Sequence, residues 1–445
     1  MNANKLSRFC LCLCAGAAAQ TPPPAITLQD ALSRARQYGG QVQSANLAVL
    51  AAREDTAQAR AGRLPTVNWF NQFIYTEGNG TPSGVFVAND GVHVYNEQAV
   101  VHEEALAFFR RAEVRRALAA EAVAQARTEI AARGLNATVI QNYYEVVASQ
   151  RKLANAQIAV QDAQRFYAIT EALEKGGEAA HADVIKAEID LRQRERDVAE
   201  SEVAIQKAAI ALGVMIFPSF TAEFSVVDDL DQIPALPALP EAQAQATATS
   251  PDLSAARAGI REAGEEVNVA RYAYVPSLGL DVFYGINANQ FAIKTEHSTQ
   301  ATGRSTLPNY QVSSRQNLGY SAQATLNIPV WNWGATRSKV KQAELRRDQA
   351  QIELTLASRE LQGNLATLHA EAQAAQAQLP SLRGSVDLAA ESLRLTLLRY
   401  QAGESTALEV VDAQTTLNSA RNAYDDGLAG YRVAIANLQT LMGTL

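Results

Sequence analysis

Apolar residues recur in steps of three and four along most of this chain. The pattern is clearest near the C-terminus, where its members are Val410, Ala413, Leu417, Ala420, Tyr424, Leu428, Tyr431, Ile435, Leu438 and Met442. This spacing predicts a helix whose apolar seam packs in a coiled coil. The same reasoning predicts helices over about 26–63, 104–172, 181–212, 240–274, 337–399 and 406–441.

Four shorter segments alternate apolar and polar residues, which predicts strands. In one of them the apolar face comprises Leu318, Tyr320, Ala322, Ala324, Leu326 and Ile328. The stretch from Leu278 to Ile286 alternates similarly apart from Phe283, and the stretch that begins at Val67 is interrupted by Asn71. Alternation over about ten residues is what a membrane barrel strand requires, and a soluble sheet with one wet face shows it too.

The order of these elements occurs twice. An offset of 211 residues aligns Pro65 with Pro276, and an offset of 226 aligns Gly177 with Gly403. Each copy consists of a helix ended by proline, two strands, a very long helix, a glycine-bearing turn and a returning helix. The predicted divisions are a signal peptide at 1–19, a first repeat at 20–213, a connector at 214–238 and a second repeat at 239–445.

The predicted helix lengths constrain the architecture. A helix of about 70 residues extends roughly 105 Å, which no single globular core accommodates, so it must lie in a coiled bundle. Two helices of about 35 residues each, stacked end to end, would flank it along its whole height. The predicted fold class is therefore α+β, with a long helical coiled coil joined to a β-sheet.

Composition and charge narrow the classes of partner. The 445 residues are 47% hydrophobic and 19% charged, and the net charge of -7 argues against nucleic acid as a main partner. Beyond the N-terminus no run of about 18 apolar residues occurs, so a membrane-crossing form would have to be a closed β-barrel. Four strands cannot close a useful barrel, whereas three chains supply twelve, so this interpretation demands a homotrimer.

The N-terminus has the pattern of an export signal. Lys5 and Arg8 precede a short apolar stretch at 9–15, and small residues at 17–19 offer a cleavage site. This segment holds all the cysteines of the chain, which are Cys10, Cys12 and Cys14. They either bind a metal or accept a lipid, or they are apolar filler in a segment that is removed, and the size of Leu13 favours the last interpretation.

No catalytic pattern stands out. The histidines are scattered through the chain at His93, His102, His181, His297 and His369. No metal-ligand spacing, catalytic triad or phosphate-binding loop accompanies them. We therefore expect no enzyme, no cofactor and no metal site.

Three stretches resemble the outer-membrane efflux protein family, whose members include TolC. They are SPDL at 250–253 leading to VPSL at 275–278, NIPVWNWG at 327–334, and RYQAGES at 399–405 followed by LEVVDAQ at 408–414. The resemblance implies a trimeric twelve-stranded barrel in the outer membrane, continued by a periplasmic helical barrel that tapers shut. It implies an exit duct of a tripartite efflux or type I secretion system. Its partners would be a periplasmic adaptor (membrane fusion protein), an inner-membrane pump and outer-membrane lipid.

The resemblance also implies a gate at the tapered end. Family acidic residues form a carboxylate ring there, and the matching positions are Asp183, Glu409 and Asp412. Such a ring favours cations. A family tyrosine, matched by Tyr400, and an arginine bond across to the acid and hold the end closed, but the arginine position falls on Ser405. Glu409 also fits a capping box that would start the returning helix.

The two turns and the exit of the fourth strand supply further candidate residues. The turn positions expected to touch the adaptor are Gly177, Gly403, Glu404 and Ser405. Trp331 and Trp333 follow the fourth strand, where interfacial aromatic residues would anchor a barrel. Ordinary packing under the barrel is the other interpretation of this tryptophan pair.

Two other functions stay open at the level of the sequence. A soluble periplasmic coiled-coil scaffold would show the same helical seam. A stand-alone porin would share the strands, although helices of roughly 100 Å disfavour a simple porin. The transported substrate cannot be read from these residues.

Overall fold

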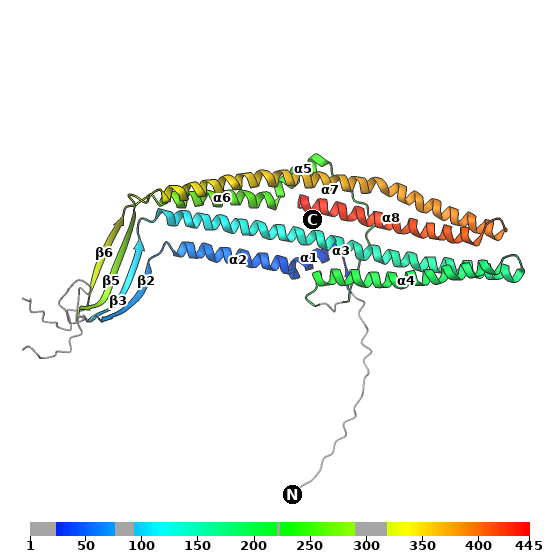
Figure 1. The fold of residues 1–445 in the computed structure, drawn as a ribbon, viewed down its shortest axis with the longest axis horizontal. Coiled ribbons are helices and arrows are strands. Elements are labelled where there is room, and N and C mark those ends of the chain that lie inside the picture. The colour runs from blue at the N-terminus through cyan, green and yellow to red at the C-terminus, as the bar shows by residue number, and fades with distance from the viewer. Residues whose placement is uncertain (1–23, 76–92, 220–222, 290–317) are drawn as a thin grey trace, which may run out of the picture. The chain divides into compact units, whose positions relative to one another are not determined.

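The computed structural model describes residues 24–75, 93–219, 223–289 and 318–445. The predicted signal peptide and its cysteines lie outside these residues. The described elements, shown in Figure 1, are β1 (Ala25–Ile26), α1 (Leu28–Tyr38), α2 (Gly40–Ala61), β2 (Thr66–Tyr75), β3 (His93–Glu104), α3 (Phe108–Gly176), α4 (His181–Ile216), β4 (Ser225–Val226), α5 (Leu239–Thr249), α6 (Pro251–Tyr272), β5 (Ser277–Asn289), β6 (Leu318–Asn327), α7 (Ala335–Gln401) and α8 (Ala407–Met442).

The four longer strands form one antiparallel sheet in the order β2-β3-β5-β6, with β2 and β6 at its edges. The register places Val101 opposite Val67 on one side and Val282 on the other, so the apolar positions of neighbouring strands share a face. This apolar face includes Val67, Trp69, Phe73, Ala99, Val101, Leu280, Val282, Tyr284, Tyr320, Ala322, Ala324 and Leu326. The predicted alternation is therefore confirmed.

Polar residues occupy most of the other face of the sheet. It includes Asn68, Gln72, Asn96, Gln98, His102, Asp281, Ser321, Gln323 and Thr325. On this face the Nδ1 atom of His102 lies 2.6 Å from a carboxylate oxygen of Asp281. Phe283 is the predicted exception, and it lies opposite Val100. On the apolar face, Asn71 lies opposite Glu97, which explains why the first strand is the less regular one.

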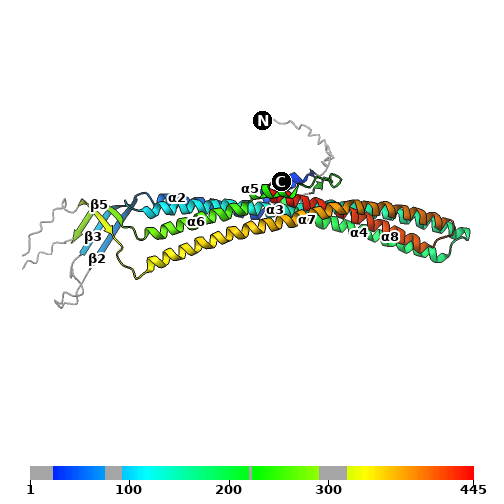
Figure 2. The same cartoon turned by 90° about the horizontal axis from the view of Figure 1, so that it is seen from above.

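The contacts divide the chain into two compact units. One unit comprises Met1–Gly39, Leu135–Pro237 and Leu368–Thr440, and the other comprises Gly40–Gly134, Ala238–Thr367 and Leu441–Leu445. The second of these contains the sheet, α2, α6 and the first parts of α3 and α7 (Figure 2). The first contains the hairpin of α3 and α4 and the hairpin of α7 and α8, and we call it the hairpin unit. Each unit draws on both halves of the sequence, and the repeat boundaries stay a prediction.

The long helices are confirmed, whereas two shorter ones are each broken. α3 has 69 residues and α7 has 67. The helix predicted over 26–63 is two helices, because Gly39 has an extended backbone at φ -65° and ψ 115°. The helix predicted over 240–274 breaks at Ser250, whose Oγ accepts a hydrogen bond from the Leu253 amide at 3.2 Å. Pro251 then starts α6, where its missing N–H is no loss.

The predicted seam of α8 is largely buried. Its buried members are Val410, Leu417, Leu428, Tyr431, Ile435, Leu438 and Met442. The alanine members are partly buried or small, which lets neighbouring helices approach closely. Within the described residues, no helix combines the length and the apolar character needed to cross a membrane.

The connector between the halves is packed against α3. β4 pairs in parallel with β1, placing Ile26 beside Val226. The Tyr143 hydroxyl of α3 lies 2.8 Å from the carbonyl oxygen of Val227 and 3.2 Å from that of Ile26. Tyr143 therefore spans both short strands and fixes the connector to α3 within the hairpin unit.

Candidate functional site

The two turns of the hairpin unit have the same backbone geometry. The amide of Glu178 donates to the carbonyl of Leu173 at 2.8 Å, and that of Glu404 donates to Arg399 at 2.8 Å. Gly177 and Gly403 have φ of 74° and 76°. These are the six-to-one hydrogen bond and left-handed glycine of a Schellman cap, which satisfies the last carbonyls of each long helix.

The helices that follow the turns begin differently. Thr406 and Glu409 form a capping box: the Glu409 amide donates to the Thr406 hydroxyl at 3.3 Å, and the Thr406 amide donates to the Glu409 carboxylate at 3.3 Å. The Thr406 hydrogen bonds lower the pKa of Glu409 below its usual value. In the first copy the N-cap residue of α4 is Ala180, whose methyl side chain cannot accept a hydrogen bond. The two tips are therefore unequal.

Tyr400 lies in an apolar cluster rather than on the surface. Its ring meets Phe166 edge to face at 5.2 Å between centroids, and Ala407 and Val410 complete the contact. Its buried hydroxyl lies beside the Thr170 side chain of α3, although the contact falls short of a well-formed hydrogen bond. Burial raises the pKa of this hydroxyl, and the nearby charge of Asp183 adds to the shift.

The remaining predicted gate and tip residues lie near these turns. Asp412 is exposed on α8, and Asp183 is partly buried in the first turn of α4. Glu404 is exposed, whereas the Ser405 hydroxyl is buried beside the Glu409 carboxylate and contributes to lowering the pKa of that group. The structure thus brings Tyr400 and Asp183 together. It assigns Glu409 to a helix cap, the local alternative that the sequence offered.

A buried ionic group on α4, which sequence reasoning missed, connects the two hairpins. Arg194 donates to Asp190 at 3.1 Å and to the Thr415 hydroxyl of α8 at 2.6 Å, and it lies 3.4 Å from Asp197. Arg194 and Asp190 are 7% and 6% exposed. The available signal was their position, because they continue the three- and four-residue steps of the buried Val184 and Ala187.

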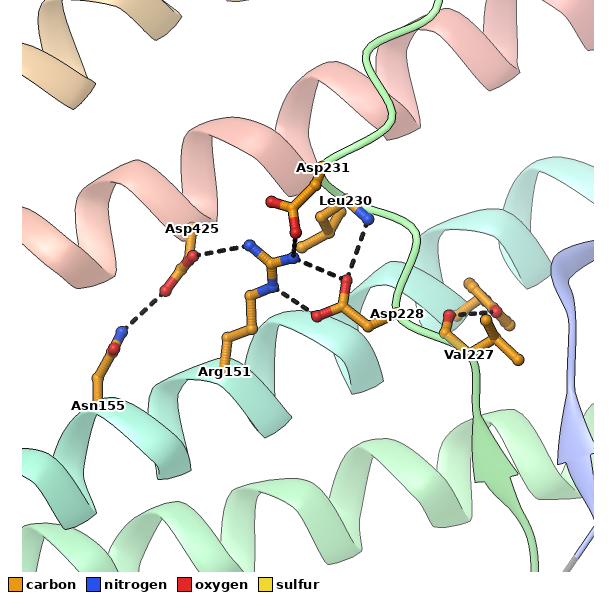
Figure 3. A network of polar contacts seen from close by, with 8 residues as sticks. Arg151, Asn155, Val227, Asp228, Leu230, Asp231 and Asp425 are labelled. Carbon is orange, nitrogen blue, oxygen red and sulfur yellow. Dashed lines mark hydrogen bonds and ion pairs between the residues drawn. The ribbon is translucent and has the colours of Figure 1, made fainter.

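A second missed group surrounds Arg151 on α3 (Figure 3). Its guanidinium binds Asp228 at 2.6 Å and Asp231 at 3.0 Å in the connector, and Asp425 of α8 at 3.3 Å. Asn155 also donates to Asp425, at 2.8 Å. This group ties the connector and both hairpins together.

Trp331 and Trp333 are exposed, at 75% and 89%. Their rings meet edge to face with centroids 5.8 Å apart. Among the described residues they are therefore largely uncovered and free to contact a surrounding phase.

Comparisons with known proteins agree with the resemblance to outer-membrane efflux proteins. Residues 243–444 match the model of the family described as outer membrane efflux protein. The outer membrane efflux protein BepC of Brucella suis is 24% identical over 282 residues, covering 60% of this chain and 58% of BepC. The cobalt-zinc-cadmium resistance protein CzcC of Cupriavidus metallidurans is 24% identical, covering 69% of this chain and 68% of CzcC. The match thus spans less than two thirds of BepC.

Solved structures establish the fold. The outer-membrane channel OprN superposes with a TM-score of 0.77 at 18% identity, covering 94% of this chain and 90% of that one. The Campylobacter jejuni CmeC outer membrane channel gives a TM-score of 0.74 at 14% identity, covering 94% and 85%. At these identities the likeness concerns the fold, which is that of the outer-membrane channels.

Proposed function

We propose that this chain, which is related to the outer membrane efflux proteins over residues 243–444 and has the fold of outer-membrane channels, is one protomer of a trimeric exit duct. The duct passes substrate across the outer membrane from a periplasmic adaptor and an inner-membrane pump. It performs no catalysis. Its role is to keep a continuous path that closes at the turns of Gly177 and Gly403.

The sheet carries this proposal. β2 and β6 leave two edges of ten residues each without partners among the described residues, and such edges are aggregation-prone unless they are paired. Pairing β6 of one copy with β2 of the next closes a twelve-stranded barrel with the apolar face outward. The polar face, with His102 and Asp281, then lines the lumen.

The tip gives the duct its selectivity. Asp412 of three copies places three carboxylates around one axis, and Glu409 adds three more while capping α8. Carboxylate rings attract cations and repel anions. Gly177, Gly403, Glu404 and Ser405 form the surface presented to the adaptor, and Trp331 and Trp333 lie at the lipid interface.

The test is reconstitution of the purified full chain in planar bilayers, with outer-membrane fractionation and heat-modifiable gel mobility alongside. We expect discrete, cation-preferring conductance and recovery with the outer membrane. A soluble scaffold would give neither result. A stand-alone porin would conduct but would not co-purify with an adaptor, so adaptor co-purification separates that function from an efflux duct.

A further inference from the structure

Three basic residues without partners lie where the long helices meet the sheet. Arg111 is in the first turn of α3, and Arg337 and Lys341 are in the first two turns of α7. All three are exposed, and none makes an ion pair among the described residues. A neighbouring cation, Arg271, does have a partner, because it lies 2.9 Å from Glu344. We call Arg111, Arg337 and Lys341 the junction cations.

Basic residues at these positions oppose the dipoles of their own helices. The N-terminal end of a helix carries partial positive charge, so acidic residues are favoured in its first turn and basic ones are not. α4, α6 and α8 follow this rule with Asp183, Asp252 and Glu409, whereas the first turns of α3 and α7 hold no acidic residue. α3 and α7 are also the long helices whose N-terminal ends adjoin the sheet (Figure 1). An anion from outside the chain would relieve the repulsion.

One side of α3 continues the polar face of the sheet. Glu104 lies two residues beyond His102, and therefore on the polar face. It lies 3.0 Å from Arg110, which also pairs with Glu113 at 3.3 Å. Glu113 and Arg127 are two heptads apart, so a coiled coil keeps them on the same side of α3.

A cavity extends this polar side across the neighbouring helices. Its volume is about 510 Å³, and its lining includes Arg127 of α3, Glu262 of α6, and Glu353 and Glu360 of α7. Lys339 precedes Glu353 by two heptads and therefore lies on the same side of α7. This side faces the lumen in the proposed duct, because it continues the polar face of the sheet.

The junction cations lie on the opposite side of their helices. Successive residues of a helix are about 100° apart, so residues two positions apart differ by about 200°. Arg111 precedes Glu113 by two positions. Arg337 and Lys341 lie two positions to either side of Lys339. The three cations are therefore on the side of the apolar face of the sheet.

We propose that the junction cations bind the anionic headgroups of phospholipids around the periplasmic end of the barrel. In the proposed duct, the apolar face and the exposed Trp331 and Trp333 put this level at the edge of the hydrocarbon region. Arginine and lysine beside a bilayer attract anionic lipid. A periplasmic polyanion would not require cations that adjoin the apolar face. The proposal rests on the membrane position of the sheet and adds a lipid preference to the duct.

Quenching of tryptophan fluorescence by brominated lipid measures this preference. The tryptophans of the chain are Trp69 on the apolar face, Trp331 and Trp333, so all of them report on lipid near the sheet. The purified full chain is reconstituted in mixtures of phosphatidylglycerol and phosphatidylcholine in which either lipid is brominated. We expect phosphatidylglycerol to bind about fivefold more tightly at about 0.1 M salt, and this preference to vanish near about 1 M salt.

The combined substitution of Arg111→Gln, Arg337→Gln and Lys341→Gln should remove the preference. Lys339→Gln is the matched control, because this lysine lies at the same level of α7 on the lumen side, and it should keep the wild-type preference. Arg111→Gln and Arg337→Gln alone should each reduce the preference. These single variants decide the question if the triple variant does not fold.

The proposal is overturned if the wild-type chain shows no preference, or if the triple variant and the wild type prefer phosphatidylglycerol equally. Loss of the preference in Lys339→Gln alone also overturns it. Binding to isolated peptidoglycan that depends on the junction cations, without a lipid preference, assigns them to that polymer instead. A wild-type chain that prefers phosphatidylglycerol but never conducts contradicts the duct and still supports the lipid site.

Discussion

At the scale of single residues, Asp412 is the carboxylate of the tip whose side chain has the smallest structural role. It is exposed, and its side chain enters no cap or ion pair among the described contacts. We expect Asp412→Ala to lower the cation-to-anion permeability ratio in planar bilayers, because the ring loses three charges. Asp426→Asn, farther along α8 and paired with Lys152 at 2.8 Å, should leave the ratio unchanged. An unaltered ratio in Asp412→Ala would remove this residue from the ring.

Tyr400 acts mainly through its ring. Because the buried hydroxyl makes no well-formed hydrogen bond and only a loose contact with Thr170, Tyr400→Phe should change the free energy of unfolding by less than about 1 kcal/mol. Tyr400→Ala should lose roughly 3–5 kcal/mol through the cavity beside Phe166. Thermal unfolding followed by circular dichroism measures both. A large loss in Tyr400→Phe would show that the hydroxyl does bond in the closed tip.

The candidate site was predictable where its contacts are local in sequence. Glu409 lies three residues from Thr406, so the capping box could be recognised from spacing alone. Arg194 bonds to Thr415, 221 positions away, and Arg151 bonds to Asp425, 274 positions away. No local pattern specifies such partners, although an arginine at a seam position was itself a signal.

At the scale of elements, the turn after α3 contains two glycines with different backbone conformations. Gly177 has φ of 74°, whereas Gly176 ends the helix and an added methyl group there would meet no atom within 4 Å. Gly177→Ala should therefore cost roughly 1 kcal/mol. Gly176→Ala should be neutral or stabilise by up to about 1 kcal/mol. Denaturant unfolding of the two variants in parallel measures the difference, and equal effects would contradict the left-handed cap.

The connector should loosen in acid. Although burial opposes it, hydrogen bonds from Arg151 and from the Leu230 amide hold the pKa of Asp228 below its ordinary value of 3.8. The stabilisation from this carboxylate is therefore complete above pH 3.8 and is lost as the pH falls through the lower folded-state pKa. We expect exchange of the Leu230 amide, corrected for intrinsic rate, to accelerate below about pH 4. Asp228→Asn should remove that acid-dependent step, and its persistence would assign the step to another group.

Most of the helices and strands could be predicted from the sequence, and the exceptions have a physical cause. Long seams, alternating strands and glycine turns are local patterns, so α3, α7, β2, β5 and β6 were predicted within a few residues, whereas β3 was expected only as the second strand of its copy, without bounds. The breaks at Gly39 and Ser250 were not. The Ser250-Pro251 pair is a visible helix start, but the apolar pattern continues across it.

At the scale of the whole molecule, the two faces of the sheet should tolerate different side chains, apolar on one face and polar on the other. Tyr320 lies on the apolar face and is 84% exposed, while the adjacent Ser321 lies on the polar face. Tyr320→Lys should reduce recovery in the outer membrane, since lysine facing lipid costs about 2–4 kcal/mol near the midplane. Ser321→Lys, one residue along the same strand, should assemble normally and change only conductance. Equal recovery of the two variants would contradict a lipid-facing apolar side.

The pairing of β1 with β4 constrains the order in which elements of this chain fold. It joins Ala25 to Ser225, and closing a loop of that length costs about 5 kcal/mol of chain entropy. The hydrogen bonds of two residue pairs cannot offset this cost alone. We therefore expect β1 and β4 to pair only after α3 and α4 have formed, when the Tyr143 hydroxyl can contact both strands. A growing chain therefore carries β1 undocked until the connector that holds β4 has been synthesised.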